Sequence, residues 1–206
     1  MWPGVGARPE LGRATTLYVL DGAILERDGV RFRPQRGATP RLAGKAVWLV
    51  IRTDTLEWPP AAHALVLRHL AQWRAAGNRV IGVQIDFDAR TAHLDRYTAF
   101  LRDVRRRLPV DARLSVTGLL DWSANGDPAA LAALAGTVDE VAIQTYRGRA
   151  TIPGYDAYLR KLDGFPIPFR VGLVEGGDWR EPAGLAANPG FRGHVVFLLP
   201  RAPAAG

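Results

Sequence analysis

Residues 80–88 read Val-Ile-Gly-Val-Gln-Ile-Asp-Phe-Asp, an apolar segment that carries three polar side chains at alternate positions. Side chains alternate along a β-strand, so Gln84, Asp86 and Asp88 are expected on one face and the apolar residues on the other. A strand this apolar is normally covered on both faces, and burying an unpaired carboxylate costs roughly several kcal/mol. Folding alone gives little reason to keep these acids, so the segment indicates a polar site at the end of a buried strand.

The rest of the chain alternates between segments typical of strands and segments typical of helices. Strands are expected at residues 16–25, 30–32, 45–52, 80–88, 113–120, 140–146, 169–174 and 194–199, and helices at 60–76, 94–108, 128–134 and 155–162. Such alternation predicts parallel pairing in a layered or closed α/β fold. A doubly wound sheet is one form, but no Gly-rich phosphate loop follows any strand. Several strands instead end in polar residues, as in a barrel whose site gathers strand ends at one mouth.

The fold class that we expect is therefore α/β, a TIM-type (β/α)8-like barrel. It is incomplete or irregular in its first β/α unit, because about seven barrel strands are found instead of eight. Residues 1–14 are rich in Gly, Pro and Arg and are expected to form an irregular N-terminal segment. Residues 15–206 are expected to form a single barrel-like domain, a length sufficient for one substantial core.

The composition excludes several classes of function. The net charge is +7, but only two of the 27 basic residues are lysines, a bias that is more typical of coding preference than of a nucleic-acid surface. The dense cluster Arg102, Arg105, Arg106 and Arg107 is expected on the solvated face of a helix, with a phosphate patch as the alternative. The chain has no cysteine, so disulfides, thiolate metal sites and a cysteine nucleophile are excluded.

No segment is typical of a membrane protein or of a secretory signal. The longest apolar run, residues 46–51, fits a strand, and the first ten residues lack both a basic and an apolar signal region. The sequence as it stands predicts a cytoplasmic protein, while a start further upstream would allow a periplasmic or secreted one. We expect no nucleic-acid or membrane partner, and the oligomeric state is not indicated.

Polar residues end several of the other strands. A barrel would bring Asp54, Asp86, Asp88, Asp121, Gln144, Tyr146 and Glu175 to a single mouth, with Arg52 and Gln84 on the same faces. Carboxylates grouped with an arginine, an amide and a phenol suit a hydroxyl-rich ligand and acid/base chemistry.

Some of these residues have a structural alternative. Asp54 and Asp121 could cap or turn the loops that they open, and Arg52 could be a buried partner that neutralises a nearby aspartate. Trp122 and Trp179 could stack on a sugar ring, and packing explains them equally well.

Metal binding and cofactor binding are not expected. The four histidines are dispersed, and His63 and His69 are six residues apart, which is wrong for one helical face. A carboxylate-only Mg²⁺ or Ca²⁺ site at Asp86 and Asp88 stays an alternative. Nothing matches a serine-nucleophile elbow or a Walker loop.

Four stretches carry a resemblance to known proteins. They are Gly-Val-Gln-Ile-Asp-Phe-Asp at 82–88, Leu-Ser-Val-Thr-Gly at 114–118, Asp-Glu-Val-Ala-Ile-Gln-Thr-Tyr at 139–146 and Pro-Phe-Arg-Val-Gly-Leu at 168–173. Together they resemble a bacterial family of unknown function numbered 3142, over most of the chain from about residue 45 onward. More distantly, the sequence is similar to family 18 glycoside hydrolases, the chitinase-like (β/α)8 barrels.

The second resemblance implies roles for three residues. In those hydrolases the fourth strand ends in D-G-x-D-x-D-x-E and the sixth carries Met-x-Tyr-Asp. The final Glu, which is the general acid, falls on Asp88, and the third Asp falls on Asp86. The tyrosine of the sixth strand matches Tyr146.

The sequence also departs from that pattern. Gln84 and Ile81 replace the two remaining acids of the fourth strand, Gln144 replaces Met, and Arg147 replaces the acid after Tyr. Aspartate is one methylene shorter than glutamate, so an acid at Asp88 lies further from a glycosidic oxygen unless the substrate enters more deeply.

The strand order implied by the resemblance leaves strand one without a counterpart. Residues 16–25 would be strand two, 45–52 strand three and 80–88 strand four. Either the reading frame starts late, or the barrel is closed by the N-terminal segment or left open.

The leading hypothesis is a carbohydrate-active barrel that hydrolyses glycosidic bonds in a poly- or oligosaccharide. Its catalytic residues would be Asp88 as general acid, Asp86 as the group that tunes or positions it, and Tyr146. Substrate-binding residues would be Gln84, Arg52, Asp54, Asp121, Trp122, Gln144 and Glu175. The alternative is a non-catalytic glycan-binding or assembly module on a degenerate hydrolase scaffold.

Overall fold

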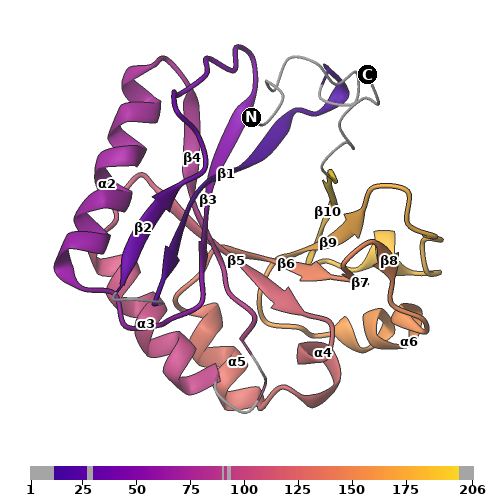
Figure 1. Cartoon of the computed structure of the whole chain (residues 1–206). Helices are drawn as coiled ribbons and strands as arrows, with labels where there is room; N and C mark the ends of the chain where they lie inside the picture. Colours follow the sequence, from indigo (N-terminus) through magenta and orange to yellow (C-terminus); the bar gives the residue numbers. More distant parts are fainter. Residues whose placement is uncertain (1–11, 27–29, 90, 92–93, 200–206) are drawn as a thin grey trace.

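A computed structural model describes residues 12–26, 30–89, 91 and 94–199, which form a mixed α/β structure around one large sheet (Figure 1). The sheet has eight strands in the order β10-β9-β6-β5-β4-β3-β1-β2. They are β1 (Thr16–Leu25), β2 (Arg31–Pro34), β3 (Ala46–Thr53), β4 (Arg79–Asp86), β5 (Arg113–Leu119), β6 (Glu140–Gln144), β9 (Phe169–Val174) and β10 (Phe191–Phe197). A two-stranded ribbon is formed by β7 (Tyr146–Arg147) and β8 (Ala150–Thr151).

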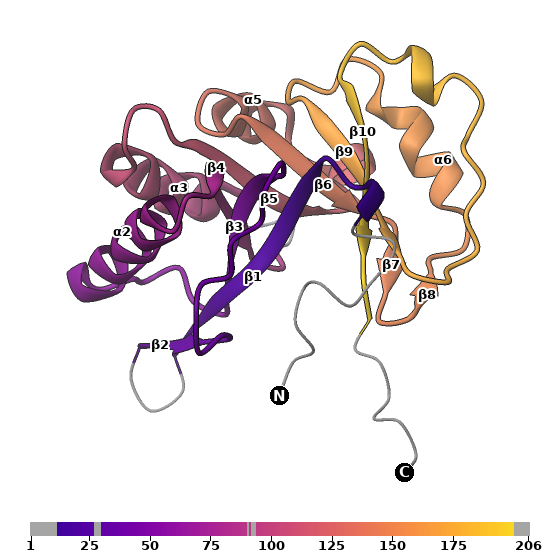
Figure 2. The same cartoon turned by 90° about the horizontal axis from the view of Figure 1, so that it is seen from above.

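Helices connect most of these strands. They are α2 (Pro60–Ala75), α3 (Leu94–Arg107), α4 (Trp122–Asn125), α5 (Pro128–Ala135) and α6 (Tyr155–Leu159), with short 3₁₀ turns η3 (Arg160–Leu162) and η4 (Leu185–Ala187). In Figure 2, α2, α3 and α5 lie along the same side of the sheet. Among the described residues, no helix combines the length and the apolar character needed to cross a bilayer.

The predicted strands and helices are found in the structure with shifts of one to three residues at their ends. The largest difference is at residues 140–146, where one expected strand divides into β6 and β7. Of the predicted N-terminal segment 1–14, residues 1–11 lie outside the described residues, and Gly12 and Arg13 are helical.

Seven strands of the sheet run parallel, and β2 is antiparallel to β1 at one edge. This agrees with the expected number of barrel strands. The sheet ends at β2 and β10, and among the described residues β1 and β10 do not pair with one another. The structure therefore establishes a mostly parallel α/β sheet without showing a closed barrel.

One face of the sheet carries the apolar core. The alternating residues Val47, Leu49 and Ile51 of β3 are buried, and they belong to the same cluster as Leu70 and Trp73 of α2. Pro60 begins α2 after Pro59, which has an extended backbone, because proline fits the first helical turn without losing a needed N–H. The residues of this parity on β3 therefore lie on the face that α2 covers.

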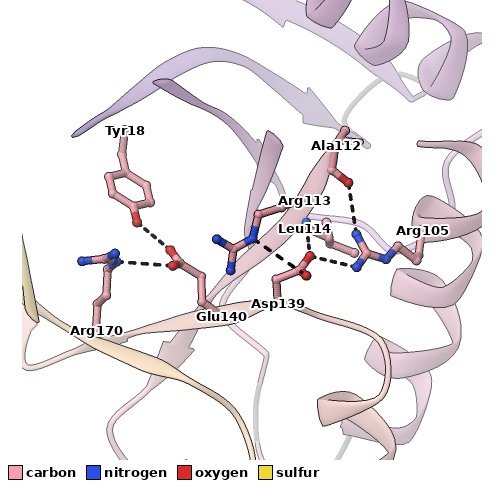
Figure 3. A network of polar contacts seen from close by, with 8 residues as sticks. All are labelled: Tyr18, Arg105, Ala112, Arg113, Leu114, Asp139, Glu140 and Arg170. Carbon is pink, nitrogen blue, oxygen red and sulfur yellow. Dashed lines mark hydrogen bonds and ion pairs between the residues drawn. The ribbon is translucent and has the colours of Figure 1, made fainter. Parts of the chain in front are cut away.

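The other face is concave and holds a polar network at the amino ends of the strands (Figure 3). The Tyr18 hydroxyl of β1 donates to Glu140 Oε1 of β6 at 2.5 Å, and Arg170 Nε of β9 donates to Glu140 Oε2 at 3.3 Å. Three strands separate β1 from β6, about 19 Å in a flat sheet at 4.8 Å per strand. A tyrosine and a glutamate cannot bridge that distance, so the sheet is strongly curled about this face.

Close packing of β4 on β5 depends on Gly82. A Cβ atom at this position would lie 1.9 Å from the carbonyl oxygen of Arg113. Above it the Arg113 guanidinium carbon lies 5.8 Å from the ring centre of Trp48, which stacks on Tyr18 with ring centres 6.0 Å apart. The glycine therefore lets β4 and β5 approach each other closely at the amino end of β5.

Candidate functional site

A cavity of about 1960 Å³ lies against the concave face and reaches the carboxyl ends of the strands. Seven of the ten predicted site residues line it: Arg52, Asp86, Asp88, Asp121, Gln144, Tyr146 and Glu175. These residues come from the ends of β3, β4, β5, β6 and β9 or from the segments that follow them. The structure thus brings these seven side chains around one space, and the roles predicted for them stay predictions.

Two rungs of side-chain hydrogen bonds join β4 to β5 on the concave face. Gln84 pairs in register with Ser115, and its amide nitrogen donates to the Ser115 hydroxyl at 2.9 Å. One rung further, the Thr117 hydroxyl donates to Asp86 Oδ1 at 3.0 Å. The lower rung is fully buried and the upper rung opens into the cavity, so β5 orients the Asp86 carboxylate from below.

The environment of Asp86 favours its protonated form. Burial raises the pKa of Asp86 above the usual aspartate value, although the positive charge of Arg52 and the hydrogen bond from Thr117 act in the opposite direction. The negative charge of Asp88 adds to the increase. Arg52 pairs in register with Asp86. Among the described residues the Arg52 guanidinium forms no ion pair within 4.0 Å, and its side chain is exposed. Arg52 is therefore not the buried neutralising partner considered from the sequence.

Asp88 lies in a tight turn beyond the end of β4, so the expected strand 80–88 is two residues too long. The Ala89 N–H donates to the Phe87 carbonyl oxygen at 2.8 Å, which folds the chain around Asp88. Phe87 packs on Tyr97 of α3 with ring centres 5.3 Å apart. Asp88 is exposed and borders both the large cavity and a second cavity of about 540 Å³. It is thus the more accessible of the two acids.

Tyr146 begins β7 and lines the large cavity together with Gln144. Burial, with the negative charges of Asp86 and Asp88, raises the pKa of the Tyr146 phenol, and a hydrogen bond with Gln144 and the charge of Arg52 partly oppose this. Its ring contacts Phe197 of β10 with centres 5.2 Å apart. The phenol therefore stays protonated and can donate a hydrogen bond beside the acids.

Three predicted site residues lie elsewhere. Gln84 is fully buried on the concave face and does not line the large cavity. Trp122 is also fully buried; its indole N–H donates to the Ala89 carbonyl at 2.9 Å and its ring contacts Tyr97, so it packs in the core and offers no surface for a sugar. Asp54 lines the second cavity instead, where its Oδ1 accepts the Glu26 N–H at 2.9 Å. Periodicity could not separate these residues from the others, because it fixes the face of a strand and not the depth.

Asp121 and Glu175 lie on the cavity wall. Asp121 immediately precedes α4, but its side chain makes no capping hydrogen bond, and its Oδ1 is buried without a hydrogen-bond partner. The capping alternative is therefore not supported for Asp121. Glu175 Oε2 accepts the Leu199 N–H at 2.7 Å, which ties the segment after β9 to the segment after β10.

Two further residues belong to the site, although a threonine and a tyrosine at these positions do not by themselves indicate a functional role. Thr117 holds Asp86, and the only signal for it in the sequence is that it has the same parity as the polar positions of β5. Tyr97 is fully buried on α3 with a hydroxyl that has no hydrogen-bond partner, and burial with the charges of Asp86 and Asp88 raises its pKa. Helical spacing assigns Tyr97 to the core, and only the tertiary structure brings it behind the two acids.

The side chains around the acids can be compared with the ligand sets that metal ions need. Within the described ranges, no group of three or more His, Asp or Glu side chains is placed to hold a metal ion. The four side chains best placed to bind a ligand directly are Asp86, Asp88, Tyr146 and Arg52, which surround one open space. This set can donate and accept protons and can hydrogen-bond to hydroxyl groups.

Residues 44–163 match a family described as Domain of unknown function (DUF3142). This match covers β3 through α6 and includes Arg52, Asp86, Asp88 and Tyr146. No curated protein matches the sequence.

Three solved structures share this fold in part. The Bacillus cereus spore cortex-lytic enzyme SleL aligns at 19% identity with a TM-score of 0.51, over 83% of this chain and 48% of that one. A chitinase-like lectin from tamarind aligns at 9% identity with a TM-score of 0.53, over 91% of this chain and 85% of that one. The chitinase domain of the Clostridium difficile spore coat protein CotE aligns at 16% identity with a TM-score of 0.49, over 82% and 67%. At these identities the likeness concerns the fold, and the chain spans about half the length of SleL.

Proposed function

The chain belongs to this DUF3142 family, whose description names no activity, and from the geometry of its site we propose that it is a carbohydrate-active protein that hydrolyses glycosidic bonds. The observation that carries the proposal is the pair Asp86 and Asp88, which opens into one large cavity at the carboxyl ends of parallel strands. That edge of a parallel sheet is where α/β barrels place their active sites. Glycoside hydrolysis commonly uses two carboxyl groups in one cleft.

The two acids differ in environment, and this difference suggests their roles. Burial raises the pKa of Asp86, so this side chain keeps its proton to a higher pH than an exposed aspartate does. Asp88 is exposed and borders the space that a ligand would occupy. In the proposed reaction Asp88 donates a proton to the glycosidic oxygen as the bond to the anomeric carbon breaks. A water molecule then adds its oxygen to that carbon and gives a proton back to the acids, where Asp86 supplies a proton reservoir behind Asp88. Tyr146 and Gln144 hydrogen-bond to the sugar.

The proposed substrate-binding surface follows from the residues that line the same cavity. Arg52, Asp121 and Glu175 offer one cationic and two anionic groups to sugar hydroxyls. Trp179 also lines the cavity and stacks on Tyr155 with ring centres 4.8 Å apart, which leaves an aromatic surface at one wall.

We further propose that residues 15–206 act as one barrel-like domain.

A second function is favoured by one of the fold neighbours. The tamarind protein is named a chitinase-like lectin, and lectins bind sugars, so a protein with this fold can be a sugar-binding protein. The replacement of the expected glutamate by Asp88 also shortens the acid by one methylene. A non-catalytic glycan-binding module is therefore the alternative proposal.

The test is hydrolysis and binding measured side by side. Wild type and the variants Asp88→Asn and Asp86→Asn are assayed on aryl glycosides and on polysaccharides that include chitin and its oligomers. General acid catalysis typically contributes 10²–10⁴-fold, so hydrolysis by Asp88→Asn is expected to fall by about that factor while glycan binding persists.

Asp111→Asn is the matched control. Asp111 is an exposed carboxylate whose Oδ2 lies 3.1 Å from Arg74 Nη2, and it does not line the cavity. Hydrolysis by this variant should equal that of the wild type. Glycan binding without turnover in the wild type would favour the lectin-like alternative. If no glycan binds and none is cleaved, both proposals fail.

A further inference from the structure

The large cavity extends well beyond the two acids. Besides the carboxyl ends of the strands it is lined by residues 13–20, which lead into and form β1, and by residues 194–198 of β10 and the segment after it. We call the space between these two walls the β1–β10 seam. Side chains fill the interior of a closed barrel, whereas here the cavity measures about 1960 Å³. That is about twice the upper end of the usual range for drug-sized ligands, so the space suits several linked sugar units.

The cavity is lined by both acidic and basic side chains. Its carboxylates end β4 or follow β4, β5 and β9: they are Asp86, Asp88, Asp121 and Glu175. Its cationic side chains are Arg13, Arg36, Arg52, Arg147 and Arg170, with His194 on the β10 wall. Burial lowers the pKa of His194, so this side chain is neutral near neutral pH and the arginines carry the positive charge.

Among the described residues, only one of the five arginines forms an ion pair with a carboxylate. Arg170 holds Glu140 and also donates to the Arg192 carbonyl. Within the part of the chain that the structure describes, the other four form no ion pair within 4.0 Å. On the helices the reverse holds at several positions, since Arg105, Arg106 and Arg107 all lie within 3.0 Å of an aspartate.

Arg36 is the clearest case of an arginine that lacks an acceptor. Its side chain is half-buried on the cavity wall, and its Nε is buried without a hydrogen-bond partner. The nearby carboxylate of Asp21 is already engaged, because its two oxygens accept from Trp73 Nε1 at 2.8 Å and contact His69 Nδ1 at 2.7 Å. A buried guanidinium N–H without a partner loses free energy, and the Arg36 side chain lines the cavity, where an anionic group would neutralise its charge.

We propose that the cavity binds an acidic glycan, a sugar chain that carries carboxylate groups, with Arg36 in the seam and Arg147 at the mouth as the receiving residues. This inference rests on the proposed carbohydrate function and names its substrate class. The planar guanidinium fork matches a carboxylate through two parallel hydrogen bonds, which a neutral hydroxyl cannot reproduce. Arg147 stands on the β7–β8 ribbon directly after Tyr146, so it places a positive charge beside the acids.

The test uses three probes that differ in charge. Oligogalacturonate, the same oligomer with its carboxylates methyl-esterified, and a chito-oligosaccharide are titrated into the wild type by calorimetry at two salt concentrations. Oligogalacturonate is expected to bind about tenfold or more tightly than its ester, and the preference should shrink at high salt because the contacts are ionic. Arg36→Gln and Arg147→Gln should each lose about tenfold in affinity for oligogalacturonate and keep their affinity for the ester.

Matched controls exist beside each residue. Arg33→Gln on β2 and Arg149→Gln on the β7–β8 ribbon remove exposed arginines that do not line the cavity, and both should bind as the wild type does. Equal losses in the controls would overturn the inference by showing general surface attraction. Equal or tighter binding of the ester or of the chito-oligosaccharide would overturn it too, while leaving the proposed function intact. Binding of none of the three probes would remove both.

Discussion

The concave face carries two polar clusters built from the same side-chain types. In one cluster the side chains bond to one another, and in the other they face a cavity. At the amino ends of the strands, Tyr18, Glu140 and Arg170 satisfy one another, and Glu140 is only 3% exposed. At the carboxyl ends, an arginine, a tyrosine and two aspartates face a cavity, and the Arg52 guanidinium makes no ion pair within 4.0 Å among the described residues. A carboxylate, a phenol and a guanidinium that bind each other stabilise the fold, whereas the same groups held apart stay available for a ligand.

The largest effect that separates the clusters should come from Glu140→Ala. This change leaves the Arg170 charge and the Tyr18 hydroxyl without their buried partner, and removing one member of a buried ion pair costs about 3–5 kcal/mol. Unfolding in urea, monitored by tryptophan fluorescence, is expected to show a loss at the upper end of what single substitutions produce. A loss below about 1 kcal/mol would mean that the network contributes little to the curled sheet.

A smaller effect should distinguish the two tyrosines. Tyr18→Phe removes a hydrogen bond to a charged carboxylate and should destabilise the protein by about 1.5–3 kcal/mol. Tyr146→Phe should change the free energy of unfolding by less than about 1 kcal/mol, because its hydroxyl bonds to the neutral side chain of Gln144 at the cavity and not to a buried carboxylate, while ligand affinity or turnover falls. Equal destabilisation by both substitutions would contradict the assignment of one cluster to folding and the other to function.

A smaller effect is expected in the pH dependence of stability, which tests the raised pKa of Asp86. Because the folded pKa of Asp86 is raised, the folded state binds more protons than the unfolded state between the ordinary aspartate pKa and the raised value. Stability of the wild type therefore falls as the pH rises through this window. Asp86→Asn removes that loss, so the variant should be more stable than the wild type at neutral pH, with the difference vanishing below the ordinary aspartate pKa. A difference that is the same at every pH would contradict the raised pKa.

The smallest expected change is produced by Thr117→Val. The Thr117 hydroxyl stabilises the ionised form of Asp86, so its loss should raise the pKa of Asp86 further. The alkaline limb of a pH–activity profile, where Asp86 loses the proton that the proposed reaction draws on, or the Asp86 carboxyl signal in NMR, should move to higher pH by a fraction of a unit up to about one unit, since a hydrogen bond of about 1 kcal/mol corresponds to that range. Ser115→Ala, one rung lower and bound to Gln84, is the control that should leave the titration unchanged.

The two clusters were not equally visible in the sequence. The strand pattern alone predicted that Asp86 follows an apolar strand and that Arg52, Gln144 and Tyr146 end neighbouring strands, and all four line the cavity. Trp122 was also predicted to be a substrate-binding residue, but it packs in the core. Periodicity reports the face of an element, and it carries no information about how far a side chain lies from the surface.

What the sequence determined by itself is the order of strands and helices and the parity of the polar positions, because both follow from local hydrogen bonding and hydrophobic alternation along the chain. The tertiary structure alone decided how far the sheet curls, since that depends on contacts such as Tyr18 with Glu140 across three strands. It also decided which acids are buried and which are exposed. The contact of Glu140 with Tyr18 and the hydrogen bond of Asp86 with Thr117 depend on distances between segments that are far apart in the chain, and a strand pattern does not give such distances.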